Sequence, residues 1–145
     1  MKIVLTLVLV AVRIFGLAQQ PVIYSTAEGA IEGYDPVAYF KEGKPVKGSN
    51  DFSFIWKEAT WHFSTLENLN TFKKSPESYA PQYGGYCSFG ASRGYKAPTK
   101  PEEAWTVFNN KLYLNYNAGV MKTWSKKKEE FIIKADENWK KIETE

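Results

Sequence analysis

The first eighteen residues differ so sharply in composition from the rest of the chain that they confine any globular fold to the remainder. Lys2 precedes an apolar run over residues 3–12, and small residues follow it at Gly16 and Ala18. A basic start, a short apolar stretch and small side chains before a cleavage point are typical of a secretory signal peptide. The run is too short for a membrane helix, which needs about 20 apolar residues. We therefore expect residues 1–18 to be a cleaved signal peptide and the mature protein to be periplasmic or secreted, with a buried core helix as the alternative.

Charge and cysteine content narrow the classes of partner. Removal of residues 1–18 would take away Lys2 and Arg13 but no acid, which lowers the formal net charge from +3 to +1. A nearly neutral protein gives no reason to expect nucleic acid or an anionic membrane as a partner. Cys87 is the only cysteine, so no internal disulfide is possible, and residues 19–145 are long enough to bury a core without one. The five Trp, nine Tyr and nine Phe are expected to build that core.

Two stretches of the chain alternate apolar and polar residues in the way that β-hairpins do. Residues 51–56 place three aromatic side chains on one face, and residues 60–64 place two more on the same side after a three-residue connection. Residues 105–108 and 111–116 flank Asn109-Asn110, a pair that tolerates the positive φ of a tight hairpin turn. The sequence therefore predicts two β-hairpins.

Capping signals predict the helices between these hairpins. Asp35 before Pro36 marks the start of a short helix, with a carboxylate at the cap and proline in the first turn. Ser64, with Glu67 three residues later, has the form of a capping box and predicts a helix over residues 65–74.

A long C-terminal helix is expected after Asn117, because apolar residues recur three, four or seven apart as far as Ile142. Four of its side chains are expected to lie on the sheet formed by the hairpins: Trp124, Phe131, Trp139 and Ile142. The predicted fold is a small single α+β domain with two β-hairpins, short helices and a long C-terminal helix packed on the sheet.

Three blocks of the sequence together resemble the YHS-domain family, and they look closest to its small exported bacterial branch. The blocks are Gly-Tyr-Asp-Pro-Val-Ala-Tyr-Phe at residues 33–40, the stretch 61–79, and Tyr-Gly-Gly-Tyr-Cys at residues 83–87. The resemblance implies a small α+β domain, and we place a YHS-like domain at residues 30–145. Residues 19–29 are then expected to be a leader segment.

The same resemblance does not carry over a metal site. Metal-handling YHS relatives hold cysteines at three places, which the resemblance assigns to Ala38, Ser64 and Asn68 of this chain. None of the three is a thiol here, and affinity for soft metals comes from thiolate or imidazole ligands. A metal site would therefore have to use other residues.

Cys87 and His62 are the residues best suited to bind a metal. Cys87 follows a glycine pair and is expected at a helix start, where unpaired N–H groups favour the thiolate; the alternative is a small buried core residue. His62, the only histidine, points to the face opposite its aromatic neighbours, and is either exposed or lines a groove. Together they offer the nitrogen and sulfur donors that copper and zinc prefer.

Asp35 is the expected third ligand of such a copper or zinc site, with a tyrosine as the alternative ligand; a helix cap is the structural alternative for Asp35. Tyr34 and Tyr39 flank it and could line a pocket for a small ligand with it. A hydrolase built on Cys87 and His62 would need an orienting third group, for which the spacing gives no support.

We interpret the chain as an exported, non-enzymatic binding module for a metal ion or a small ligand. Two alternatives stay open: a thiol-dependent enzyme or redox protein that uses Cys87, and a structural domain that contacts another envelope protein. The metal-site and redox motifs HExxH and CxxC do not occur.

Overall fold

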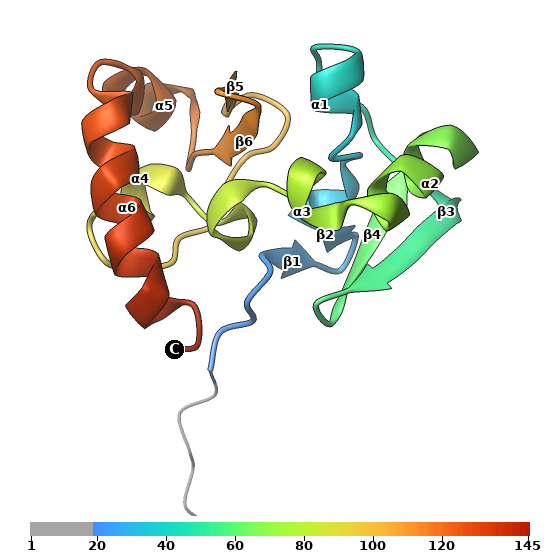
Figure 1. The fold of residues 1–145 in the computed structure, drawn as a ribbon, viewed down its shortest axis with the longest axis horizontal. Coiled ribbons are helices and arrows are strands. Elements are labelled where there is room, and N and C mark those ends of the chain that lie inside the picture. Colours follow the sequence, from blue (N-terminus) through green and yellow to red (C-terminus); the bar gives the residue numbers. More distant parts are fainter. Residues whose placement is uncertain (1–18) are drawn as a thin grey trace, which may run out of the picture.

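Three separate antiparallel hairpins, rather than one continuous sheet, form the β part of this α+β fold (Figure 1). The computed structural model describes residues 19–145, so the expected signal peptide at residues 1–18 lies outside the described residues. The pairs are β1 (Ser25–Thr26) with β2 (Gly29–Ala30), β3 (Ser49–Trp56) with β4 (Ala59–Phe63), and β5 (Trp105–Phe108) with β6 (Lys111–Leu114). Both predicted hairpins are confirmed, but each is a two-stranded sheet of its own.

The two larger hairpins close through two-residue turns with positive φ. Asn109 and Asn110 have φ of 50° and 58°, as the sequence predicts, and Lys57 and Glu58 have φ of 49° and 61°. Both turns match the right-handed twist of the flanking strands. Ala59, expected in the first connection, is instead the first residue of β4.

Helical segments of three to nine residues connect the hairpins, and two more helices, the second 15 residues long, end the described chain. They are η1 (Ile31–Gly33), α1 (Ala38–Lys41), α2 (Leu66–Lys74), α3 (Pro76–Tyr79), η2 (Gln82–Gly85), α4 (Ser88–Ser92), α5 (Ala118–Ser125) and α6 (Lys128–Ile142). The cap of α2 differs from the prediction: Thr65 Oγ1 accepts the N–H of Asn68 at 3.0 Å, while the hydroxyl of Ser64 is bonded elsewhere.

The predicted long C-terminal helix is two helices, α5 and α6. Asn117 caps the first, as expected, by accepting the N–H of Val120 at 2.9 Å. The helix breaks at Lys127, whose φ of −139° and ψ of 40° are not helical. Charge favours this break, since lysines follow the end of α5 while Glu129 and Glu130 lie in the first turn of α6. Basic groups at a helix C-terminus and acidic groups at an N-terminus both interact favourably with the helix dipole.

The hairpin β5–β6 separates two hydrophobic cores. Alternate side chains of β6 point to opposite faces: Leu112 and Leu114 pack in a first core with Trp61, Phe63 and other side chains of the N-terminal half. Tyr113 belongs to a second core that contains Trp124 and Ala135, beneath α4, α5 and α6. In Figure 1 these three helices stand on the opposite side of β5–β6 from α2, β3 and β4.

The segment expected to be a leader, residues 19–29, is built into the fold. Ile23 is buried in the first core, and the N–H of Tyr24 donates to the carbonyl of Gly84 at 2.8 Å. A side chain at Gly84 has no room, because its Cβ would lie 1.9 Å from the carbonyl oxygen of Val22. Within residues 19–145, no helix is both long and apolar enough to cross a membrane.

Candidate functional site

The carboxylate of Asp35 is fully buried and held by neutral hydrogen-bond donors. Its Oδ1 accepts the backbone N–H groups of Val37 at 2.8 Å and Ala38 at 3.3 Å. Asp35 thus binds the start of this segment from the side chain as predicted, but α1 begins at Ala38 with Val37 as its N-cap, two residues later than expected. Its Oδ2 accepts the N–H and the hydroxyl of Ser64 and the side-chain amide of Asn68, each at 2.8 Å. Five hydrogen bonds therefore stabilise a buried charge that would otherwise be costly.

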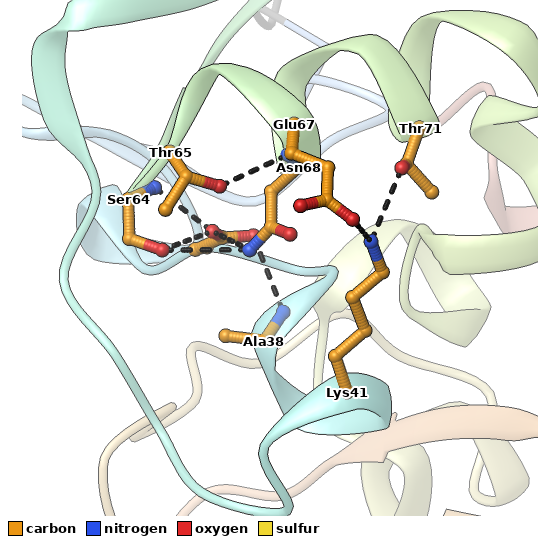
Figure 2. A network of polar contacts seen from close by, with 8 residues as sticks. Ala38, Lys41, Ser64, Thr65, Glu67, Asn68 and Thr71 are labelled. Atoms are coloured by element: carbon orange, nitrogen blue, oxygen red, sulfur yellow. Dashed lines mark hydrogen bonds and ion pairs between the residues drawn. The ribbon is translucent and has the colours of Figure 1, made fainter.

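Three segments of the chain meet at this carboxylate. Ala38 begins α1, Ser64 follows the last residue of β4, and Asn68 lies in the first turn of α2; Figure 2 shows all three converging. Beside them Lys41 Nζ and Glu67 Oε1 form an ion pair, with 3.1 Å between the two atoms. Asp35 thus ties three segments together, and both of its oxygens already have protein partners.

Tyr34 and Tyr39 do not open a pocket together with Asp35. Tyr39 is 1% exposed and its hydroxyl donates to the carbonyl of Pro101 at 2.7 Å. Burial raises the pKa of Tyr39 far above its ordinary value. The hydroxyl of Tyr34 donates to Glu102 at 3.3 Å, and the ammonium of Lys47 lies 4.6 Å from the centre of its ring.

Cys87 is the N-cap of α4, as predicted, but its thiol is buried and only 2% exposed. Its Sγ accepts the N–H of Gly90 at 3.4 Å, and its S–H donates to Oδ1 of Asn115 at 3.6 Å. Burial raises the pKa of this thiol despite the hydrogen bonds that lower it. The prediction of a thiolate is therefore wrong. Loss of hydration raises the pKa of the buried thiol more than the hydrogen bonds at the start of the five-residue α4 lower it.

The structure does not bring Asp35, His62 and Cys87 together as metal ligands. Within the part of the chain that the structure describes, no three side chains of His, Cys, Asp or Glu are grouped closely enough to hold a metal ion. Cys87 begins α4, whereas His62 is on β4 in the other half of the molecule (Figure 1).

His62 is the predicted site residue that lines an open cavity. The cavity has a volume of about 760 Å³ and lies between the β1–β2 turn and the edge of β4; we call it the His62 pocket. Its wall includes Glu28, Gly29, Lys47, Gly48 and Thr60. As expected, His62 lies on the face of β4 opposite the buried Trp61 and Phe63, where it is half-buried.

Glycine lets the pocket wall approach the imidazole closely. A Cβ on Gly29 would lie 2.8 Å from Nε2 of His62 and 2.7 Å from the carbonyl oxygen of Thr60. Gly29 also has a φ of 110°, which favours glycine. The Nε2 edge of the ring therefore faces the cavity wall at Gly29, on the far side from Nδ1.

Ser53 fixes the Nδ1 edge of the His62 ring. Ser53 Oγ lies 2.9 Å from Nδ1 of the ring and 2.9 Å from the carbonyl oxygen of Asn50. Ser53 is therefore shared between the imidazole and the backbone of its own strand. Sequence reasoning missed Ser53, although its place opposite His62 in the hairpin register is the signal that would have found it.

A G-x-S-x-G pattern at residues 90–94 has the letters of a hydrolase nucleophile elbow but not its structure. Ser92 is the last residue of α4, rather than the turn between a strand and a helix. Its hydroxyl donates to the carbonyl of Phe89 at 2.6 Å, so it is not free to attack a substrate.

Comparison with known proteins adds no relative from which function could be transferred: no family model, no curated protein and no solved structure matches the chain.

Proposed function

We propose that this protein is an exported, non-enzymatic binding module whose His62 pocket holds a small polar ligand. The observation that carries this proposal is the position of His62, which is held at Nδ1 by Ser53, packs its Nε2 edge against Gly29 and lines an open cavity. The N-terminal signal-like pattern and the YHS resemblance support the exported and binding parts of the proposal.

The ligand should carry hydrogen-bond donors. The carbonyl oxygen of Thr60 lies at the wall beside the imidazole, and the carboxylates of Glu28 and Glu58 also line the cavity, so acceptors are already present there. The one lysine of the wall, Lys47, is already engaged by Glu28 at 2.9 Å and by the carbonyl of Glu32. An amine, an amide or a hydroxylated molecule would therefore complement the pocket better than an anion would.

We favour a small molecule over copper or zinc because the other two expected ligands are occupied. Both oxygens of Asp35 accept hydrogen bonds from the protein, and the thiol of Cys87 is buried, which raises its pKa. A metal at the pocket would have one imidazole as its only soft-metal ligand, whereas copper and zinc sites use three or four protein ligands.

Nitrogen-15 NMR of the imidazole tests this proposal directly, because one histidine gives one set of ring signals. Pools of small amines, amides and polyols, and Cu(I) and Zn(II) separately, would be added to protein labelled at histidine. We expect a member of the small-molecule pools to shift the Nε2 signal while Nδ1 stays bonded to Ser53.

His62→Gln should abolish this binding, and Ser53→Ala should weaken it by freeing the ring to rotate. The matched control is Thr106→Ala, which changes a half-buried polar strand residue of the other hairpin. A shift of both ring nitrogens by a metal, with no response to small molecules, would overturn the proposal in favour of a metal site.

A further inference from the structure

A second cavity, of about 450 Å³, lies where the two cores meet, and we call it the junction pocket. Five segments line it: Val22 and Ile23, the tip of the β3–β4 hairpin, the stretch over residues 77–84, the start of β6, and the C-terminal part of α6 with Glu143. This volume is in the usual range for small-molecule sites, about 300–1,000 Å³. None of its residues belongs to the His62 pocket, so it is a separate site.

The floor of the junction pocket is held in a strained backbone conformation. Tyr83 is 5% exposed and has φ of 57° and ψ of 37°, which is unusual for an aromatic residue. Its hydroxyl donates to Asp136 at 2.8 Å, and its ring packs edge-on to Trp139 at 6.0 Å between centroids. Strained, buried residues of this kind cluster at binding sites, where they hold a surface in a preset shape.

Two tryptophans from opposite halves of the molecule form the walls. Trp56 packs against Phe72, with an angle of 90° between the ring planes and 5.7 Å between the ring centroids. Trp139 packs against the rings of Tyr83 and Tyr86. Both are half-buried and line the cavity. An indole offers a flat apolar face together with an N–H donor. One ammonium lies over each ring, that of Lys57 at 4.7 Å from the centroid of Trp56 and that of Lys96 at 5.7 Å from the centroid of Trp139.

The rim carries equal numbers of positive and negative groups: Lys57, Lys111, Lys140, Glu77, Asp136 and Glu143. Within residues 19–145 none of these three lysines forms an ion pair. The rim therefore offers many hydrogen-bond donors and acceptors but no net charge that would select an ion.

We propose that the junction pocket binds a neutral saccharide of one or two rings. A sugar ring has apolar C–H faces that suit the indole walls, and hydroxyls that both donate and accept hydrogen bonds along the balanced rim. This chemistry differs from that of the His62 pocket, which has no aromatic wall.

Isothermal titration of the mature protein with neutral mono- and disaccharides tests the proposal, using glucose, galactose, mannose, N-acetylglucosamine and their disaccharides at millimolar concentration. We expect one of them to bind and to shift the indole N–H signals of Trp56 and Trp139 in NMR spectra. Trp139→Leu should weaken binding at least tenfold, a loss of about 1.4 kcal/mol or more. Trp56→Leu, in the other core, is the second variant should Trp139→Leu fail to fold.

Lys140→Ala should weaken binding severalfold, whereas Lys141→Ala, one residue along the same helix and outside the pocket, should not change it. The proposal is overturned if no neutral saccharide binds, or if binding persists in Trp139→Leu and Trp56→Leu. It is also overturned if glucuronate or glucosamine binds more than tenfold better than glucose, since the pocket would then select charge.

Discussion

The side-chain amide of Asn68 donates to Oδ2 of Asp35 at 2.8 Å and thereby fastens the first turn of α2 to the segment that begins α1 (Figure 2). The contact joins residues 33 positions apart in the sequence. It belongs to a set of five hydrogen bonds that hold a buried carboxylate, and such bonds to a charged group contribute more than neutral ones.

Asp35→Asn should destabilise the protein by about 3 kcal/mol, because an amide NH₂ would face the donors of Ser64 and Asn68 in a buried site. Asp51→Asn, which changes an exposed carboxylate of β3, is the matched control and should cost less than about 0.5 kcal/mol. Urea unfolding followed by circular dichroism measures both. Equal costs for the two changes would show that the buried network contributes nothing specific.

Trp124→Ala should cost about 3–5 kcal/mol of unfolding free energy, as large aromatic truncations in cores do. Its side chain is fully buried in the second core and packs against Tyr113, with 5.3 Å between the two ring centroids. Ile133→Ala on α6 is the control, since Ile133 is 70% exposed and should matter little. A small effect of the tryptophan change would mean that α5 does not help to close that core.

Cys87 should react with iodoacetamide only when the protein unfolds, because the thiol is buried and its pKa is raised. A folded pKa above the unfolded one means that the thiol stabilises the fold fully below the unfolded pKa of roughly 8.5, and less as pH rises through the folded pKa. Stability should therefore decline in alkaline solution, and more steeply than in Cys87→Ala.

Mass spectrometry of the alkylated protein and urea titrations from pH 7 to 10 measure both effects. Alkylation of the native protein at the rate of a free thiol would contradict the burial of Cys87 and reopen the thiol-enzyme alternative.

Lys96→Met should destabilise the protein by about 1 kcal/mol, because one partly buried acceptor, the carbonyl of Glu143, would lose its donor. The ammonium of Lys96 donates to the backbone oxygens of Glu143 at 2.9 Å, Glu145 at 3.0 Å and Gln20 at 3.3 Å, the last two exposed, and so joins the two ends of the described chain. The control is Lys100→Met, whose exposed ion pair with Glu103 should contribute little. Hydrogen exchange at the last turn of α6 should accelerate in the first variant alone.

The double change Lys57→Asn and Glu58→Gly should stabilise the protein by about 1 kcal/mol. Both residues have positive φ in a two-residue turn, a conformation that costs an ordinary side chain about 1–2 kcal/mol and that Asn-Gly prefers. A rise in the thermal midpoint checks this expectation. A fall would mean that the cation–π contact of Lys57 with Trp56, at 4.7 Å, contributes more than the turn strain costs.

The features that the sequence predicted correctly are those set by neighbouring residues. Both hairpins follow from period-two alternation, the Asn109-Asn110 turn from its tolerance of positive φ, and the start of α5 from the Asn117 cap. The break at Lys127 was missed because the apolar spacing continues through it, although the change from lysines to glutamates marks it in the sequence.

The surroundings of Asp35, His62 and Cys87 could not be predicted in this way, because they are formed by segments that are distant in the sequence. Ser64 has the local sequence pattern of a capping box, but its hydroxyl donates to Asp35 instead of capping α2. The cavity beside His62 exists because the β1–β2 turn passes close over the ring at Gly29, which no local pattern in either segment reveals. The raised pKa of Cys87 has the same origin, since burial by the second half of the chain decides it.

The shared hairpin β5–β6 also constrains the order of events during synthesis. The first core needs Leu112 and Leu114, and the second needs Tyr113, so a growing chain can close neither core until this hairpin has been made. A chain whose stabilising contacts are so distant in sequence folds late and slowly. Most of the described chain must therefore be synthesised before either core can close.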